Sequence, residues 1–237
     1  MSEILTHVRS VRNSEALSWT DSFANPTGGD LLLITLHTRS AVSVSSISFG
    51  GVTPELIASA VSDWPGVFVY GIRKANQPTE GQTHDVEVTF SGATNGVVTL
   101  TKLSDILPSV QDSVLSSLTT SAVDNSDSSS DITTSVAAVA HSFLFSALTH
   151  RDGCPPALTS EGETLTVETF DSPRGAGVAL AEVTSAGEHS VSWSWGTTGR
   201  RRHIVVAIPR NPPLPETPTG LVVALTSANS IMWGWDG

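Results

Sequence analysis

The chain has little cysteine and little lysine. Its single cysteine, Cys154, allows no internal disulfide and no cysteine-based zinc site, so we expect folding in a reducing cytoplasm. Only two lysines occur among 237 residues, and 23 acidic residues outnumber 12 basic ones, which gives a net charge of −11. This charge balance disfavours nucleic acid as a partner, because phosphates attract basic surfaces.

Membrane-directed segments are also missing. No stretch of about 18 apolar residues is present, so the sequence predicts no transmembrane helix and no membrane insertion. Residues 1–12 lack the apolar core and cleavage site of a signal peptide, so Sec-type secretion is not predicted. A chain of 237 residues is long enough to bury a core without disulfides or a metal.

What the sequence has in abundance is serine and threonine, with 34 and 27 residues. β-Branched residues such as threonine and valine favour strands over helices. Alternation supports strands too, because Val86, Val88 and Phe90 would share one face of an extended segment. Residues 31–36 are continuously apolar, which predicts a central strand covered on both sides. The composition and patterns therefore predict an all-β fold.

Gly, Pro, Asn, Asp and Ser separate the predicted strands, as turn residues do. The strands are expected near residues 4–12, 16–23, 31–39, 44–49, 55–61, 67–74, 84–91, 96–103, 132–138, 141–150, 163–170, 175–184, 188–195 and 202–209. Residues 109–118, after Pro108, fit either a helix or an extended crossover. The Asp/Ser-rich stretch 124–131 is interpreted as a solvated loop, because its spacing does not match a calcium loop.

Two halves of the sequence echo each other. Residues 31–40 resemble 143–152, and residues 67–100 parallel 177–208. Two such halves fit either the two packed sheets of one sandwich or two small sandwiches. One sandwich is preferred, because the connection between the halves is not proline-rich. In this comparison His37 and His150 take equivalent places, as do His84 and His189.

The sequence divides into three parts. Residues 1–210 are predicted to form one domain. Residues 211–218 contain four prolines, which predicts a stiff, extended linker. Residues 219–237 begin a new strand pattern.

The tail, with Pro218-Thr219-Gly220-Leu221 followed by a second strand that ends in Trp235, resembles the opening of a fibronectin type III domain. In that family a Pro-x-Gly-Leu strand precedes a strand with a buried tryptophan. A complete module needs about 100 residues. The resemblance therefore implies an incomplete module in 219–237 and a parent polypeptide that continues past Gly237.

The body resembles jelly-roll modules of tailed-phage virion proteins and of some bacterial surface proteins. The resemblance is carried by the order of residues 29–33, 46–51 and 187–195 along the chain. It implies an antiparallel jelly-roll-like β-sandwich with a surface or adhesion role, and it supplies no catalytic motif. Fibronectin repeats after such a module are typical of phage head spikes, tail tips and fibres.

No catalytic or cofactor motif appears, so neither an enzyme nor a cofactor is predicted. Seven histidines are scattered along the chain: His7, His37, His84, His141, His150, His189 and His203. They are interpreted as hydrogen-bonded turn and strand-end residues, and no metal site is predicted. Cys154 lacks an activating base in sequence. The carboxylate pairs Glu161/Glu163 and Asp85/Glu87 are interpreted as solvated strand positions rather than glycosidase acids.

Four residues are candidates for ligand binding. Trp64, beside Pro65-Gly66 in a predicted turn, could offer an aromatic face to a sugar or fold back over the end of the sandwich. Arg200, Arg201 and Arg202 form the only basic cluster, and their position after Gly199 in a turn would let the first two side chains project. Anionic glycans or an acidic patch on a neighbouring subunit would suit them, and a plain solvated turn is the alternative. Trp193 and Trp195 are predicted to lie in the core.

These features predict a structural protein on the surface of a tailed-phage particle, as head spike or decoration or as tail tip or fibre. It would contact other virion proteins and copies of itself in a symmetric oligomer, and it would present adhesion modules to the host surface. The alternative is a carbohydrate-binding accessory module of a bacterial surface protein. A glycan-degrading enzyme is disfavoured.

Overall fold

The fold is all-β and antiparallel. The computed structural model describes residues 4–61, 65–150, 157–160, 163–170, 175–212, 221–227 and 230–235. The first half contains β1 (Ile4–Asn25), β2 (Leu31–Thr38), β3 (Val44–Phe49), β4 (Glu55–Val61), β5 (Gly66–Arg73) and β6 (Gln82–Leu103). The second half contains β7 (Thr119–Ala138), β8 (Ser142–His150), β9 (Ala157–Ser160), β10 (Glu163–Phe170), β11 (Ala176–Val183) and β12 (Gly187–Pro209). The expected fold class is confirmed at the level of an antiparallel, sandwich-like β protein.

Each half builds one six-stranded sheet, and the two sheets have the same strand order. The first runs β1-β6-β2-β5-β4 with β3 added on β6, and the second runs β7-β12-β8-β11-β10 with β9 added on β12. Adding six to each strand number converts the first order into the second. The two sequence halves thus have matching connectivity, while the jelly-roll class stays a prediction.

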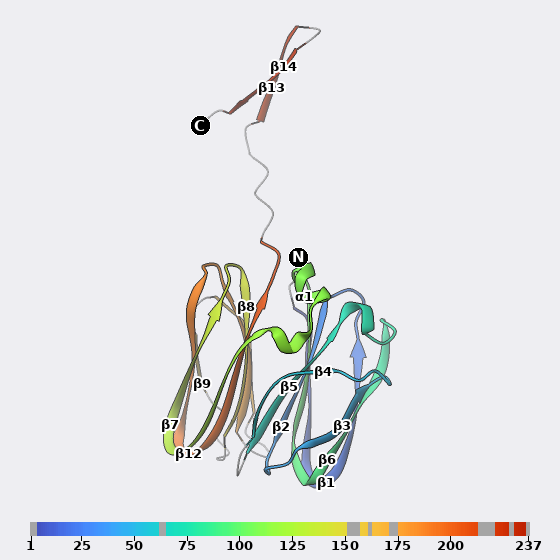
Figure 1. Ribbon diagram of the computed structural model, residues 1–237, viewed down its shortest axis with the longest axis vertical. Coiled ribbons are helices and arrows are strands. Elements are labelled where there is room, and N and C mark those ends of the chain that lie inside the picture. The colour runs from blue at the N-terminus through green and yellow to red at the C-terminus, as the bar shows by residue number, and fades with distance from the viewer. Residues whose placement is uncertain are drawn as a thin grey trace.

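The long strands fold each sheet over onto itself. The first part of β6 pairs with β3 between Val86 and Phe90, and its second part pairs with β2 between Gly96 and Leu103. β1 follows β6 along both parts, with irregular register between Arg12 and Ser18 where both strands bend (Figure 1). Each half therefore encloses a core of its own: Trp19, Phe49 and Val88 belong to the core of the first half, and Trp193 and Val205 to that of the second.

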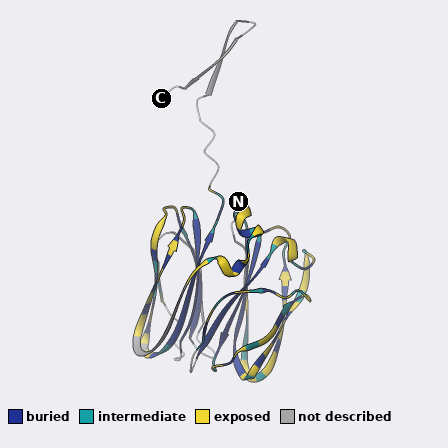
Figure 2. Cartoon of the chain, viewed as in Figure 1, coloured by how far each residue is buried: buried dark blue, intermediate teal, exposed yellow. Residues whose placement is uncertain are grey.

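A third core cluster joins the two halves. Alternate residues of a strand point to opposite faces. Leu31 and Leu33 of β2 accordingly contact the shared cluster, while Leu32 faces the core of the first half. Phe143 and Phe145 of β8 reach the shared cluster from the other side. All residues of β2 and β8 are buried, as Figure 2 shows for the inner strands, so the prediction of a central strand covered on both sides is confirmed.

The packing combines both arrangements that the sequence allowed. The two sheets lie face to face through the shared cluster, as in the preferred single sandwich. Each half also has the enclosed core of a small sandwich.

The crossover between the halves differs from the expectation. A helix α1 covers only Pro108–Asp112, and a 3₁₀ turn, η2, covers Leu115–Ser117; a second 3₁₀ turn, η1, spans Lys74–Asn76.

The solvated loop predicted at 124–131 is wrong, because β7 runs through this stretch and its backbone pairs with β12. Pairing with a long partner strand compensates for the poor strand propensity of Asp, Asn and Ser. The short strand β9 was not predicted.

Glycine turns connect the strands as expected. Gly50 and Gly51 both have positive φ and close a two-residue hairpin between Phe49 and Val52, whose backbones exchange hydrogen bonds of 2.9 and 3.0 Å. Gly28 and Gly29, also at positive φ, lie between β1 and β2. The turn predicted around Asp63 and Trp64 lies in 62–64, outside the described residues.

Both chain ends leave the body at one end, which we call the proximal end. Ile4 pairs with Leu103, and the Asn211 N–H donates to the carbonyl oxygen of Asp105 at 2.7 Å (Figure 1). The opposite, distal end carries the last residues of β2 and β8 and the first residue of β11, where Ala176 pairs with Thr149. A hairpin of β13 (Leu221–Ser227) and β14 (Ser230–Trp235) follows the body in sequence. Within the described ranges, no helix has the length and apolar content needed to cross a membrane.

Candidate functional site

The arginine cluster lies at the distal end, in a strand rather than in a turn. β12 continues through all three residues, and Arg202 pairs with Thr149 of β8. Arg201 is 4% exposed and Arg202 is fully buried, whereas Arg200 is half-buried. The prediction that Arg200 and Arg201 project freely is therefore wrong for Arg201. Successive residues of a strand point to opposite faces, so the three side chains do not form one patch.

Arg201 packs within the second half. Its guanidinium carbon lies 5.7 Å from the ring centroid of Trp195, and the same ring stacks on His150 at 4.8 Å and 12°. Arginine on an aromatic face gains electrostatic attraction while it covers apolar surface. Trp195 and Trp193 are both buried, which confirms their predicted place in the core.

The fourth candidate, Trp64, lies outside the described residues, as does Cys154. The nearest described part of β5 begins with Gly66, which pairs with Thr38 at the end of β2. Ligand binding by Trp64 and Arg200–Arg202 stays a prediction.

His37 links the two halves near this end. Its Nδ1 lies 2.8 Å from the Thr149 hydroxyl oxygen. Thr149 is also the residue that aligns with His37 in the sequence echo. His150, which was expected to be equivalent to His37, instead stacks on Trp195 within the second half. The expected equivalence is wrong by one residue, and one residue along a strand reverses the face.

A buried histidine occupies the core of the second half. His203 is fully buried, and its Nε2 lies 2.8 Å from the Ser146 hydroxyl oxygen. Ser146 also accepts a hydrogen bond of 2.9 Å from the Trp193 indole N–H. Burial lowers the pKa of His203 to about 3, so the ring is neutral at pH 7. This Ser–His pair has no access to solvent and serves packing rather than catalysis.

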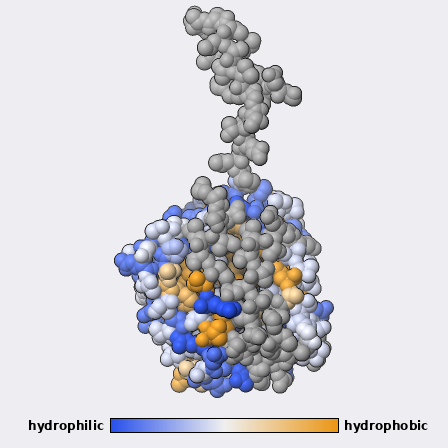
Figure 3. Space-filling view, turned by 180° about the vertical axis from the view of Figure 1, so that it is seen from behind, coloured by the Kyte–Doolittle hydropathy of each residue, from blue (hydrophilic) through white to orange (hydrophobic). Residues whose placement is uncertain are grey.

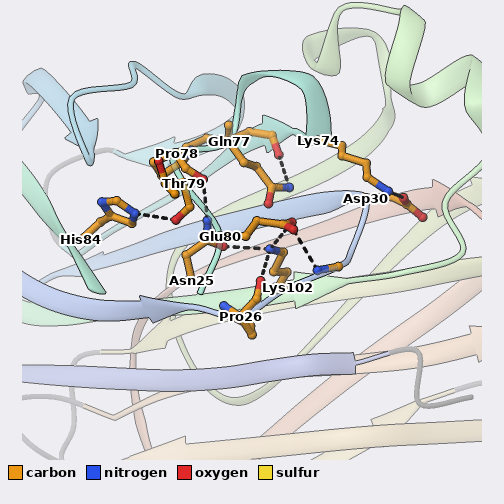
Figure 4. Close-up of polar contacts among 12 residues, drawn as sticks. Asn25, Pro26, Asp30, Lys74, Gln77, Pro78, Thr79, Glu80, His84 and Lys102 are labelled. Carbon is orange, nitrogen blue, oxygen red and sulfur yellow. Dashed lines mark hydrogen bonds and ion pairs between the residues drawn. The ribbon is translucent and has the colours of Figure 1, made fainter. Parts of the chain in front are cut away.

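A buried lysine occupies the corresponding core of the first half at the proximal end. Lys102 is fully buried, and its Nζ donates to Asn25 Oδ1 at 2.8 Å, the Pro26 carbonyl oxygen at 2.5 Å and Glu80 Oε1 at 3.0 Å (Figure 4). Asn25, also fully buried, donates from Nδ2 to the Pro78 carbonyl oxygen at 2.8 Å. We call Lys102, Asn25 and Glu80 the lysine cage.

Glu80 is the solvent-facing member of the cage. Its Oε2 accepts the Gly28 backbone N–H at 3.0 Å, and this hydrogen bond, followed by that from Lys102, lowers the pKa of the carboxyl group. No motif in the sequence marks these residues as a site. The available signal was a lysine in the otherwise apolar and threonine-rich segment 97–103.

The outer faces of the two halves are covered with hydroxyl groups. In the first half, a depression of about 400 Å³ on β1, β3 and β6 is lined by small polar side chains, among them Ser18, Thr20, Ser46, Ser48, Thr53 and Glu87. In the second half, Ser135 and Ser190 contact each other across β7 and β12 at 2.9 Å. From behind, the coloured surface shows apolar residues only as small separate patches (Figure 3).

The described residues bring together no group of three or more His, Cys, Asp or Glu side chains suited to a metal ion. Asp85 and Glu87 lie on the exposed face of β6, where they contact Ser22 and Ser48 respectively. No family model, curated protein or solved structure matches the chain.

Proposed function

We propose that the chain is a structural protein on the surface of a tailed-phage particle that presents adhesion modules. The observation that carries this proposal is the placement of Ile4 and Asn211 at the proximal end, opposite the C-terminal ends of β2 and β8. A body attached near its distal end would expose the proximal end, and the module that follows it, to a host surface. The proline-rich residues 211–218 suit a spacer between this body and a following module.

The fully covered inner strands fit a load-bearing role. β2 and β8 have no exposed residue, and the two halves share one apolar cluster. Among the described strands, β10 ends its sheet and has no ladder partner on its outer side. Such an edge is a natural contact for other virion proteins or further copies of the chain.

Particle localisation tests the proposal. Antibody raised against the purified chain, followed by gold labelling of purified phage particles, should mark the head or the tail surface. Detection of the chain only in the particle-free fraction of a lysate would overturn the proposal. A triple variant, Arg200→Ala with Arg201→Ala and Arg202→Ala, should fold less stably than the wild type. Its incorporation into phage particles is therefore compared with that of the wild type at equal amounts of folded protein.

Carbohydrate binding is the second candidate, and the hydroxyl-lined depression favours it. Serine, threonine and carboxylate groups such as Glu87 can exchange hydrogen bonds with the rim of a sugar ring. A glycan array probed with the chain should return a ligand whose binding weakens in Glu87→Ala and not in Asp131→Ala on the second half. If no glycan on the array binds the chain, carbohydrate binding is contradicted and the structural role is the remaining proposal.

A further inference from the structure

The lysine cage combines three chemically complementary groups. Lys102 supplies an amine, Asn25 an amide carbonyl and Glu80 a carboxylate that contacts the amine. Lys102 and Asn25 are fully buried, while a third of the Glu80 side chain is exposed. A lysine rarely occupies a fully buried position without a specific partner. We propose that Lys102 and Asn25 form an intramolecular amide bond, with Glu80 as the catalytic proton carrier.

The reacting atoms are already close. Nζ lies 2.8 Å from Asn25 Oδ1, and the carbonyl carbon is one C=O bond, about 1.2 Å, beyond that oxygen. The amine is therefore within about 4 Å of the carbon that it attacks, against about 3 to 3.5 Å in an attack-ready arrangement. The hydrogen bond from Nδ2 to the Pro78 carbonyl oxygen fixes which end of the amide faces the lysine (Figure 4).

The reaction balances without any further reagent. Glu80 takes one proton from the Lys102 ammonium group, and the neutral amine attacks Cγ of Asn25. The bond from Cγ to Nδ2 then breaks while Glu80 returns its proton to the leaving nitrogen. The second proton lost by Nζ follows the same route. The products are a Lys102–Asn25 amide and one ammonium ion, and Glu80 ends as a carboxylate.

The position of Glu80 suits this role. It contacts Nζ at 3.0 Å through one carboxylate oxygen, and the Gly28 N–H holds the other at 3.0 Å. Its exposure to solvent gives the released ammonia a way out. The following residue, Pro26, has no backbone N–H, so Asn25 cannot lose ammonia by the competing cyclisation onto the next peptide nitrogen.

The amide would close the first half covalently. It joins the end of β1 to the end of β6, two segments 77 residues apart in sequence. A pull on the N-terminus would then pass from Asn25 directly to Lys102, and β2, β3, β4 and β5 would carry none of it. Nothing in this chemistry depends on where the chain acts, so it stands or falls separately from the proposed function.

Mass spectrometry of the unmodified chain is the first test. The intact mass should be lower than the sequence mass by one ammonia molecule. Trypsin should fail to cut after Lys102 in the denatured protein, because its amine is bound in the amide. The peptide of residues 13–39, which contains Asn25, should then stay joined to the peptide of residues 75–151, which contains Lys102. A full sequence mass with complete cleavage after Lys102 would overturn the proposal and leave a non-covalent ammonium site.

Variants identify the bond and its catalyst. Lys102→Arg keeps the positive charge and should restore the full mass, whereas Lys74→Arg, at the only other lysine, should keep the loss of ammonia. Glu80→Gln preserves the size of the side chain and should slow bond formation on the order of a hundredfold or more. A loss of ammonia that survives in Lys102→Arg would place it elsewhere and contradict the proposal.

Discussion

The two halves of the chain share one strand order but fill their own cores differently. The sequence echo aligns Leu31 with Phe143, and their partners across the ladder, Leu103 and Ile208, then align as well. With these anchors, Ile34 corresponds to Ser146, Val98 to His203 and Lys102 to Ala207. In each of these pairs, one half has a polar residue at the position where the other half has an apolar residue.

This difference shows what the common backbone requires and what it leaves open. The ladder hydrogen bonds form between backbone groups, so they are indifferent to whether position 98 or its counterpart 203 carries valine or histidine. The side chains must fill the space and give buried polar groups partners. The second half does so with Ser146 between His203 Nε2 and the Trp193 indole, and the first half does so with the lysine cage.

The shared cluster should couple the halves most strongly. Phe145→Ala removes a fully buried ring from that cluster and should lower the free energy of unfolding by about 3 to 5 kcal/mol. Denaturant unfolding, followed by tryptophan fluorescence, should remain a single transition. Val114→Ala, at an exposed position, should change little. Two separated transitions in the wild type would show that the halves unfold independently.

The lysine cage should be the next most sensitive feature. Compared with the chain before amide formation, Lys102→Met leaves Asn25, the Pro26 carbonyl group and Glu80 without their donor, so the free energy of unfolding should fall by about 2 to 3 kcal/mol. Lys74→Met is the matched control, because Lys74 is exposed and its contact with Asp30, at 3.4 Å, is a surface ion pair. Equal effects of the two substitutions in thermal unfolding would contradict this prediction.

Acid should destabilise the second half through His203. Its folded pKa of about 3 lies below the usual histidine pKa of 6.5, so between these two values the unfolded chain binds a proton that the folded chain does not. Stability is therefore lost as the pH falls from about 6.5 towards about 3, by about 1.4 kcal/mol per pH unit at most.

The contribution of His203 should appear as a difference between variants. His203→Val, which copies the valine of the first half, should reduce the loss of stability between pH 7 and pH 5 by about 2 kcal/mol. Ile204→Val, which changes the neighbouring buried residue and removes no titratable group, should keep the wild-type slope. Parallel pH profiles of wild type and His203→Val, measured by urea unfolding, would refute the assignment.

The outer hydroxyl ladders should matter least for stability. Ser190→Ala removes the exposed contact with Ser135 and should cost about 0.5 kcal/mol or less. Ser48→Ala, which removes the contact with Glu87 on the first half, should behave alike. A large effect in thermal unfolding would mean that these faces bury more than hydroxyl contacts.

Strands were predictable wherever local pattern and environment agree. Residues 44–49, 55–61 and 163–170 were predicted with the bounds that the structure shows, because turn residues end them on both sides. Predicted neighbours such as 84–91 and 96–103 proved to be parts of one bent strand, β6. Residues 119–131 were missed because their pairing with β12 comes from distant residues, not from their own composition.

The candidate site was less predictable. The burial of Arg201 and Arg202 follows from the passage of β12 across β8, a long-range pairing that a run of three arginines does not encode. The lysine cage joins residues 25, 80 and 102, and no spacing motif connects them.

By itself the sequence determined the all-β class, most strand positions, the glycine turns and the covered central strand of residues 31–36. These depend on local propensity and on period-two alternation, which act over a few residues. Only the tertiary structure decided how the long strands fold each sheet over, which face each arginine takes and which groups surround Lys102. Those outcomes depend on contacts between residues far apart in sequence, and a local pattern carries no information about them.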